Sequence, residues 1–124
     1  GSDPTGGAGL QADLQVFRAL GVHGGAVPTV LTIQDGLRVR QVLPVFPTSL
    51  LEMLRTTLDA LRPDAIKIGM LATPEIIETV AASLEGFGGP VVLDPVLRAG
   101  GGSELSGRAL RDAVLGQLLP EVSL

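Results

Sequence analysis

Apolar residues recur at intervals of three and four along four stretches of the chain. The stretches cover residues 6–20, 49–61, 73–87 and 106–118. This spacing places apolar side chains on one face of an α-helix, so it predicts four amphipathic helices. Their expected buried faces carry Leu10, Leu14 and Phe17; Leu51, Leu54, Leu58 and Leu61; Ile77, Val80, Leu84 and Phe87; and Leu110, Val114 and Leu118.

Capping residues mark the expected ends of these helices. Ser49 with Glu52 forms a capping-box pattern, and Thr73 precedes a proline and a glutamate, which is typical of a helix start. Ser106 is the expected N-cap of the last helix, and Gly21 is the expected stop of the first.

Shorter apolar runs lie between the predicted helices. Residues 25–33, 65–69 and 91–94 predict buried strands, although Pro28 indicates an edge position or an irregular start for the first of them. Residues 39–45 predict a short extended segment. Residues 122–124 could open a further strand. Apolar strands that alternate with helices indicate a parallel sheet with helices on both faces. We therefore expect an α/β fold with three layers and a mostly parallel sheet.

Several notable residues fall where the predicted strands end. Gln34 closes the first strand, Gly69 and Met70 follow the second, and Asp94 closes the third. Parallel sheets bind ligands outside the carboxyl ends of their strands. The opening loop would follow a strand placed before the first residue, so we expect all four segments to face one crevice.

The first thirteen residues form a glycine-dense acidic loop that leads into the first helix. A helix N-terminus presents unpaired N–H groups that favour anionic or polar ligand atoms. The loop fails the Walker A pattern, because Gly7 and Ala8 stand where lysine and serine or threonine are needed. Gly7, Gly9 and Ala12 fit a dinucleotide-binding pattern, but Asp35 comes late for its acidic partner. Alone, the loop is a weak motif.

Composition narrows the class of protein. With 124 residues, of which 45% are hydrophobic, the chain has the length and apolar content of one globular domain. A net charge of −4, no Trp or Tyr and only three Phe argue against nucleic-acid binding. No uncharged run reaches the ~20 apolar residues of a membrane span. Without cysteines or a signal-peptide pattern, the expected compartment is the cytoplasm.

Five residues are the main candidates for chemistry. Gln34 either hydrogen-bonds a heteroaromatic ring with an exocyclic amine or saturates local backbone, and its spacing leaves both interpretations open. Asp3 and Asp94 can hold a magnesium–phosphate group, although a turn former and a strand-end cap are the commoner roles. Met70 can form an apolar wall over a flat ring or fill the core. Lys67, inside a strand, predicts a structural ion pair.

Four ordered segments together resemble a known family. They are GSDPTGGAGLQAD at residues 1–13, LTIQ at 31–34, AIKIGML at 65–71 and VVLDPV at 91–96. This set closely resembles the hydroxymethylpyrimidine and phosphomethylpyrimidine kinases of thiamine biosynthesis, which belong to the ribokinase-like family. The resemblance covers essentially the whole chain.

The resemblance implies an ATP-dependent, Mg²⁺-assisted phosphorylation of the hydroxymethyl group of a pyrimidine, and then of its monophosphate. By motif position, Gln34 would hydrogen-bond the pyrimidine, and Asp94 would lie near the phosphate and the metal. The residues implied to line the substrate pocket are Gly1, Asp3, Met70 and Val96.

Compared with the family pattern, this sequence departs in three places. Family members have a strand before the opening loop, and they continue past the position of Leu124 into a segment that carries the catalytic residue and most ATP contacts. We therefore expect no catalytic residue within residues 1–124, which would form a partial kinase domain, the substrate-binding half, that does not turn over unaided. Many members carry a Lys-Ser-Gly sequence after the position of Val96, whereas here Arg98 is the only basic candidate for a phosphate contact. An incomplete sheet would expose an edge and apolar faces, so we expect a homo-oligomer.

Two other functions stay open at this point. A pyridoxal or pyridoxine kinase of the same fold would also bind a flat heteroaromatic alcohol. A non-catalytic module would bind a thiamine precursor, or dock another protein, without any dependence on nucleotide.

Overall fold

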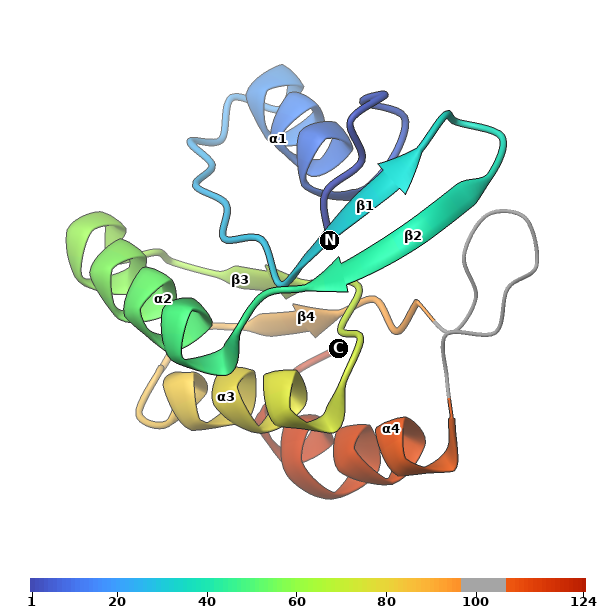
Figure 1. Cartoon of the computed structure of the whole chain (residues 1–124). Helices are drawn as coiled ribbons and strands as arrows, with labels where there is room; N and C mark the ends of the chain where they lie inside the picture. The colour runs from blue at the N-terminus through green and yellow to red at the C-terminus, as the bar shows by residue number, and fades with distance from the viewer. Residues whose placement is uncertain (97–106) are drawn as a thin grey trace.

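The structure is a computed structural model that describes residues 1–96 and 107–124 (Figure 1). Helices and strands alternate along most of the chain. The elements are α1 (Gly9–Ala19), β1 (Val30–Gln34), β2 (Val39–Pro44), α2 (Pro47–Leu61), β3 (Ile66–Ile68), α3 (Pro74–Leu84), β4 (Val91–Leu93) and α4 (Arg108–Ala113), which continues as a π-helix (Val114–Leu118) and a 3₁₀ turn (Leu119–Glu121). All four predicted helices are present.

The helix boundaries confirm some of the predicted caps and correct others. Thr73 caps α3, because its Oγ1 accepts a hydrogen bond of 3.3 Å from the Ile76 N–H. The predicted capping box at Ser49 is wrong, since α2 begins at Pro47 and Ser49 lies inside the helix. Proline suits the first helical position and sets this earlier start. Gly107 is the N-cap of α4, and the predicted cap Ser106 lies outside the described residues.

The strands β1 and β2 form an antiparallel hairpin, which the sequence pattern did not predict. The strand predicted over residues 25–33 begins only at Val30, and it is not buried on both faces. Val30 and Thr32 are buried, whereas Leu31 and Ile33 are about half exposed on the opposite face. The apolar run therefore belongs to a two-stranded ribbon with one open face rather than to the interior of a parallel sheet.

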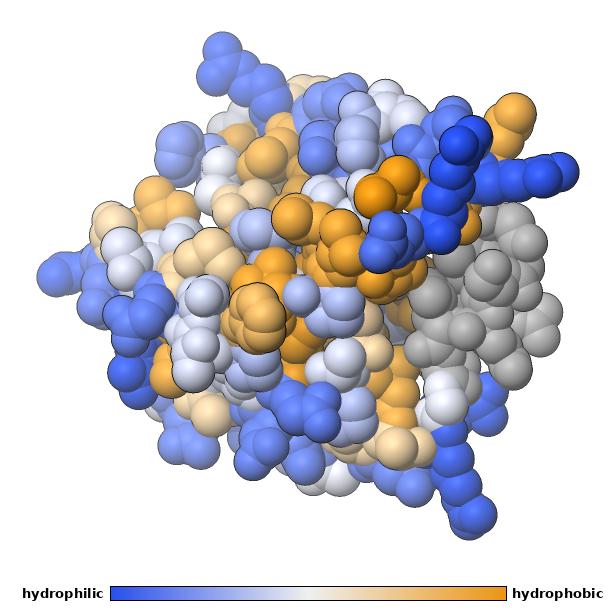
Figure 2. Space-filling view, viewed as in Figure 1, coloured by the Kyte–Doolittle hydropathy of each residue, from blue (hydrophilic) through white to orange (hydrophobic). Residues whose placement is uncertain are grey.

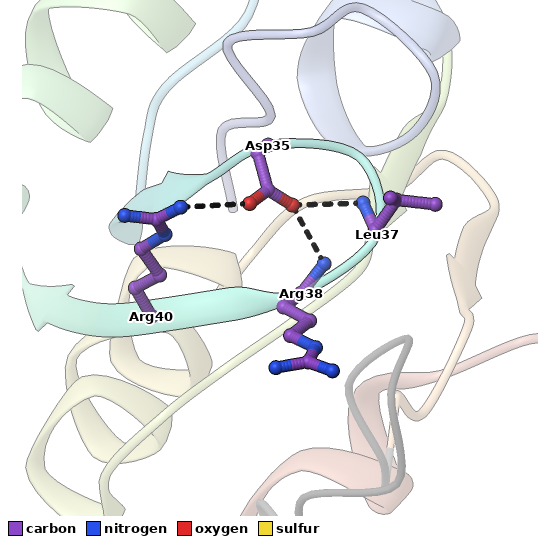
Figure 3. A network of polar contacts seen from close by, with 4 residues as sticks. All are labelled: Asp35, Leu37, Arg38 and Arg40. Carbon is purple, nitrogen blue, oxygen red and sulfur yellow. Dashed lines mark hydrogen bonds and ion pairs between the residues drawn. The ribbon is translucent and has the colours of Figure 1, made fainter.

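The hairpin turn is held by one carboxylate (Figure 3). Asp35 Oδ1 accepts hydrogen bonds from the N–H groups of Leu37 at 3.0 Å and Arg38 at 2.9 Å. Its Oδ2 pairs with the Arg40 guanidinium at 3.1 Å. These donors lower the pKa of Asp35, with the Arg38 N–H as the largest cause. Asp35 therefore serves this turn, and not the ribose contact that a dinucleotide site would require.

The strands β3 and β4 form the parallel part of the fold. Ile66 pairs with Val91 and Ile68 with Leu93 in register. In Figure 1, α3 and α4 lie on one side of the β3–β4 pair, and α1 with the hairpin lies on the other. Helices on both sides of a parallel pair agree with the predicted layers.

The last residues of the chain lie beside β4. The Ser123 N–H donates to the Val91 carbonyl at 2.8 Å, and the Leu93 N–H donates to the Leu124 carbonyl at 2.8 Å. The strand predicted to open at residues 122–124 is not formed as a regular element. Their hydrogen bonds nevertheless place Leu124 alongside β4, where an added strand would pair. The predicted strand is therefore not formed, although the segment lies along β4.

The hydrophobic core lies between β3–β4 and the helices α2, α3 and α4. Its fully buried members include Leu50, Ile76, Ile77 and Leu118. Helix α1, by contrast, contributes no fully buried residue. No helix among residues 1–96 and 107–124 has both the length and the apolar content to cross a bilayer. The core therefore supports the sheet from the side opposite to α1.

Candidate functional site

A cavity of about 240 Å³ opens where the ends of β1, β3 and β4 meet the opening loop. Six residues that the family resemblance places at the substrate or phosphate site line it together. They are Gly1, Asp3, Gln34, Met70, Asp94 and Val96. The predicted convergence of the four segments on one crevice is therefore confirmed. Arg98, the basic candidate for a phosphate contact, lies outside the described residues.

Sequence reasoning missed several other residues that line the same cavity. They are Ser2, Asp13, Thr32 and Val39. Thr32 gave a local signal, because it is a polar residue two positions before Gln34 and so shares its strand face. Asp13 gave none, since its partner Lys67 is 54 residues away in sequence.

The opening loop is stabilised by its own polar groups. The Asp3 carboxylate accepts hydrogen bonds from the Thr5 N–H at 2.9 Å and from the Thr5 hydroxyl at 2.8 Å. The Thr5 N–H, first among these donors, lowers the pKa of the Asp3 carboxyl. The Asp3 N–H donates to Gln11 Oε1 at 2.8 Å. Asp3 thus has the turn-forming role that the sequence left open, and its contact with substrate stays a prediction.

Glycine is required where the loop enters α1. Gly9 has a φ of +59°, and a Cβ there would lie 2.5 Å from the Gly1 carbonyl oxygen. That carbonyl accepts a 3.0 Å hydrogen bond from the Leu10 N–H. The loop therefore turns back onto the first turn of the helix, and one of the free N–H groups of the helix is already used.

Gln34 is oriented by a short chain of hydrogen bonds. Its Nε2 donates to Thr32 Oγ1 at 2.8 Å, and the Thr32 hydroxyl donates to the Ser2 carbonyl at 2.8 Å. A register irregularity between Ile33 and Gln34 turns the end of the strand, which is how bulges re-aim side chains. The hydrogen bonds of the described residues leave Gln34 Oε1 unused, so it can accept one from a ligand amine.

Met70 forms an apolar wall beside the start of the loop. Its Sδ lies 3.3 Å from where a Cβ on Gly1 would stand. The Met70 carbonyl accepts a 2.7 Å hydrogen bond from the Thr29 hydroxyl. The backbone of Met70 is therefore fixed, while its flexible thioether side chain can adapt to a ring in the cavity.

A lysine links two carboxylates at the other side of the cavity. Lys67 Nζ lies 2.7 Å from Asp13 Oδ1 and 3.9 Å from Asp94 Oδ2. The predicted ion pair of Lys67 is thereby confirmed, with partners that the sequence did not identify.

The residues at the cavity fit a magnesium ion only in part. Across the described ranges, no three His, Cys, Asp or Glu side chains are grouped so that they could hold a metal. The side chain of Asp94 is nevertheless 61% exposed, so its carboxylate can be reached by a metal ion. Mg²⁺ at phosphoryl-transfer sites commonly uses one or two carboxylates together with phosphate oxygens and water. A single carboxylate is therefore compatible with a metal held mainly by a nucleotide.

The family model and the curated relatives agree on one family. A family model described as phosphomethylpyrimidine kinase matches residues 3–124. The chain is 41% identical over 125 residues to the hydroxymethylpyrimidine/phosphomethylpyrimidine kinase of Escherichia coli K12, covering 100% of this chain and 47% of that one. It is 42% identical to the Bacillus subtilis 168 protein of that name, covering 96% and 44%. The chain thus spans about half the length of these relatives.

Solved structures confirm the ribokinase-like α/β fold. The phosphomethylpyrimidine kinase of Clostridium difficile 630 matches with a TM-score of 0.89 and 32% identity, over 98% of this chain and 53% of that one. The pyridoxal kinase of Staphylococcus aureus, solved in complex with pyridoxal, matches with a TM-score of 0.84 and 34% identity, over 98% and 45%.

Proposed function

Because this chain belongs to the phosphomethylpyrimidine kinase family, we propose that it supplies the pyrimidine-binding half of a kinase in thiamine biosynthesis. The substrates are 4-amino-5-hydroxymethyl-2-methylpyrimidine and its monophosphate, phosphorylated at the expense of ATP. The observation that carries the proposal is the convergence of four motif segments, far apart in sequence, on one cavity.

Each cavity wall has a proposed role in binding the pyrimidine. Gln34 Oε1, left unused by the Thr32 hydrogen bond, accepts a hydrogen bond from the exocyclic amine. Met70 and Val96 cover the ring with apolar surface, and the absence of a side chain at Gly1 lets the ring approach the loop. The loop that Asp3 stabilises closes the cavity on the α1 side.

Phosphoryl transfer requires groups that position the phosphates and neutralise their charge. Asp94, at the exposed rim of the cavity, would hold Mg²⁺ together with the phosphates of ATP. When bound, the metal offsets the charge that develops on the transferred phosphoryl group. The catalytic residue and the ATP contacts, expected beyond the position of Leu124, stay a prediction, and they would belong to the part of the family's length that this chain does not span.

We therefore expect the 124-residue chain to bind the pyrimidine without phosphorylating it. Isothermal titration calorimetry with 4-amino-5-hydroxymethyl-2-methylpyrimidine tests binding. An assay with ATP and Mg²⁺ tests turnover, with the Escherichia coli relative as the active control. Product formed by a preparation of verified mass would refute the proposal that this chain is only the substrate half, and the absence of binding heat would refute the pyrimidine site.

A pyridoxal kinase is the second candidate, favoured by the match to the Staphylococcus aureus pyridoxal kinase. Pyridoxal is also a flat heteroaromatic alcohol, but it lacks the exocyclic amine that Gln34 Oε1 would bind. Displacement titrations of the two compounds against the same preparation separate the candidates. Tighter binding of pyridoxal would favour the second one.

The proposal also covers the compartment, the partners and the oligomeric state of the protein. We propose a cytoplasmic protein, with a small-molecule substrate and neither nucleic acid nor membrane as a partner. We also propose a homo-oligomer, because the exposed face of the β1–β2 hairpin carries Leu31, Ile33 and Leu43.

A further inference from the structure

Lys67 is the charged residue of the short strand β3, and its neighbours decide which way it faces. Ile66 and Ile68 pack with the core on the side of α2 and α3. Successive side chains of a strand point to opposite faces. Lys67 therefore points away from the core, toward the side of the β3–β4 pair on which α1 lies (Figure 1).

On that side Lys67 meets carboxylates from two other segments. Asp13 belongs to the second turn of α1, and its Oδ1 lies 2.7 Å from Lys67 Nζ. Asp94 follows β4, and its Oδ2 lies at 3.9 Å. Both side chains of the closer pair are less than one third exposed, at 30% and 28%. Partial burial reduces the screening by solvent that makes most surface pairs weak.

Helix α1 has little else to fix it against the β3–β4 pair. It has no fully buried side chain, so apolar packing holds it less firmly than α2 and α3 are held. The loop before it is joined to β1, where the Ser2 N–H donates to the Val30 carbonyl at 2.8 Å. Within residues 1–96 and 107–124, the Lys67–Asp13 pair is the one hydrogen bond that joins α1 to the β3–β4 pair.

We propose that Lys67 is a positioning residue, which ties the α1 wall of the cavity to the ends of β3 and β4. Lys67, Asp13 and Asp94 all line the cavity. When the tie is lost, α1 and the opening loop can shift as a unit, since the Leu10 N–H joins the helix to Gly1. The distance between α1 and the ends of β3 and β4, which carry Met70 and Asp94, is then no longer fixed.

The test compares substitutions at both ends of the pair with a matched pair elsewhere. Lys67→Met keeps the length of the side chain and removes its charge, and Asp13→Asn removes the charge of its partner. Lys67→Arg is the conservative rescue. Arg40→Met breaks the ion pair with Asp35 in the hairpin turn, which lies outside the cavity lining, and it is the control for loss of an ion pair as such.

Two readouts are measured on the 124-residue chain. Hydrogen–deuterium exchange should rise in residues 1–19 for Lys67→Met and for Asp13→Asn alike, and remain at the wild-type level for Lys67→Arg and Arg40→Met. Calorimetric affinity for 4-amino-5-hydroxymethyl-2-methylpyrimidine, which rests on the proposed function, should fall roughly fivefold for Lys67→Met. The combined Lys67→Met and Asp13→Asn variant should exchange no faster than either single variant.

Unchanged exchange in residues 1–19 of both single variants would overturn the positioning role. The two proposals fail separately. If the wild-type chain releases no heat with the pyrimidine, the proposed function fails, while the exchange comparison still decides whether Lys67 positions α1. If Lys67→Met does not fold, the isosteric Asp13→Asn variant supplies the same comparison.

Discussion

Gln34 lines the cavity with one half of its amide already engaged. Its Nε2 is held by Thr32, and its Oε1 is available. We expect Gln34→Ala to weaken binding of the aminopyrimidine by about 1 kcal/mol, or roughly fivefold in Kd, because one hydrogen bond is lost. Titration calorimetry measures the effect. Gln41→Ala is the control, since Gln41 is an exposed glutamine of the same hairpin outside the cavity. Equal affinities for the two variants would contradict the role of Gln34.

Gly9 is constrained by both its backbone angle and its neighbour. With φ at +59° and the Gly1 carbonyl oxygen 2.5 Å from a Cβ, an alanine cannot be added without moving backbone. We expect Gly9→Ala to lower the free energy of unfolding by about 2 kcal/mol. Urea denaturation monitored by circular dichroism measures it. Gly88→Ala is the control, because a Cβ there meets nothing within 4 Å. A Gly9→Ala variant as stable as Gly88→Ala would count against the close approach of loop and helix.

The carboxylate of Asp3 makes the stability of the loop depend on pH. Hydrogen bonds from Thr5 lower its pKa in the folded protein below the ordinary value of 3.8. A depressed folded pKa adds stability above the unfolded pKa, and this contribution is lost as the pH falls through the folded pKa. The thermal midpoint should therefore fall less steeply in Asp3→Asn than in wild type between about pH 5 and pH 2. Thr5→Ala should give an intermediate slope, and parallel curves for all three proteins would rule out this contribution.

Among the elements, α3 has the helix start that its sequence specifies. Thr73 caps the helix, proline occupies the first helical position, and Glu75 lies in the first turn. We expect Thr73→Ala to destabilise the protein by about 1 kcal/mol, because the Ile76 N–H loses its acceptor. The midpoint of urea unfolding measures the change. Thr48→Ala, in the exposed first turn of α2, is the control because the Thr48 side chain caps no helix within the described residues. If Thr48→Ala destabilised the protein as much as Thr73→Ala, the Thr73 cap would have no specific role.

Local signals predicted the elements better than they predicted the pairing of strands. The cap at Thr73 depends on residues three apart, and the sequence predicts it correctly. The apolar run at residues 25–33 predicts a strand of a parallel sheet, although β1 pairs antiparallel with β2. Composition does not distinguish a strand buried on both faces from one whose alternate residues, here Leu31 and Ile33, stay half exposed.

At the cavity too, the sequence predicted some contacts and not others. Met70 and Asp94 could be placed together because each follows a strand of the parallel β3–β4 pair, and parallel strands end at one edge. Gln34 was placed there on the same reasoning, and it lines the cavity although β1 pairs antiparallel with β2. The contact between Lys67 and Asp13 could not be predicted, since it depends on how α1 lies against β3. Asp3 was identified, but its use within the loop became clear only from the position of Thr5.

At the scale of the whole molecule, apolar side chains gather on a face that the described residues leave uncovered. Figure 2 shows hydrophobic side chains across the middle of the viewed face, over the β1–β2 hairpin. Leu31 and Leu43 pair across the strands, with 46% and 38% exposed, and Ile33 extends the same face at 48%. Within the described residues β2 pairs only with β1, so its outer edge is also open. Such edges and apolar faces favour association.

We expect this hairpin face to cause self-association of the 124-residue chain. Each square ångström of apolar surface that a second copy buries contributes about 25 cal/mol, and a charge placed in that face opposes its burial. Size-exclusion chromatography with light scattering should therefore give a mass above 12.7 kDa for wild type. The double variant Leu31→Lys with Ile33→Lys should give the monomer mass. Leu115→Lys, at an exposed leucine of the C-terminal helix, should associate like wild type, because it leaves the hairpin unchanged. If the wild-type chain remains monomeric as its concentration rises, the exposed hairpin face does not bind a second copy of the chain.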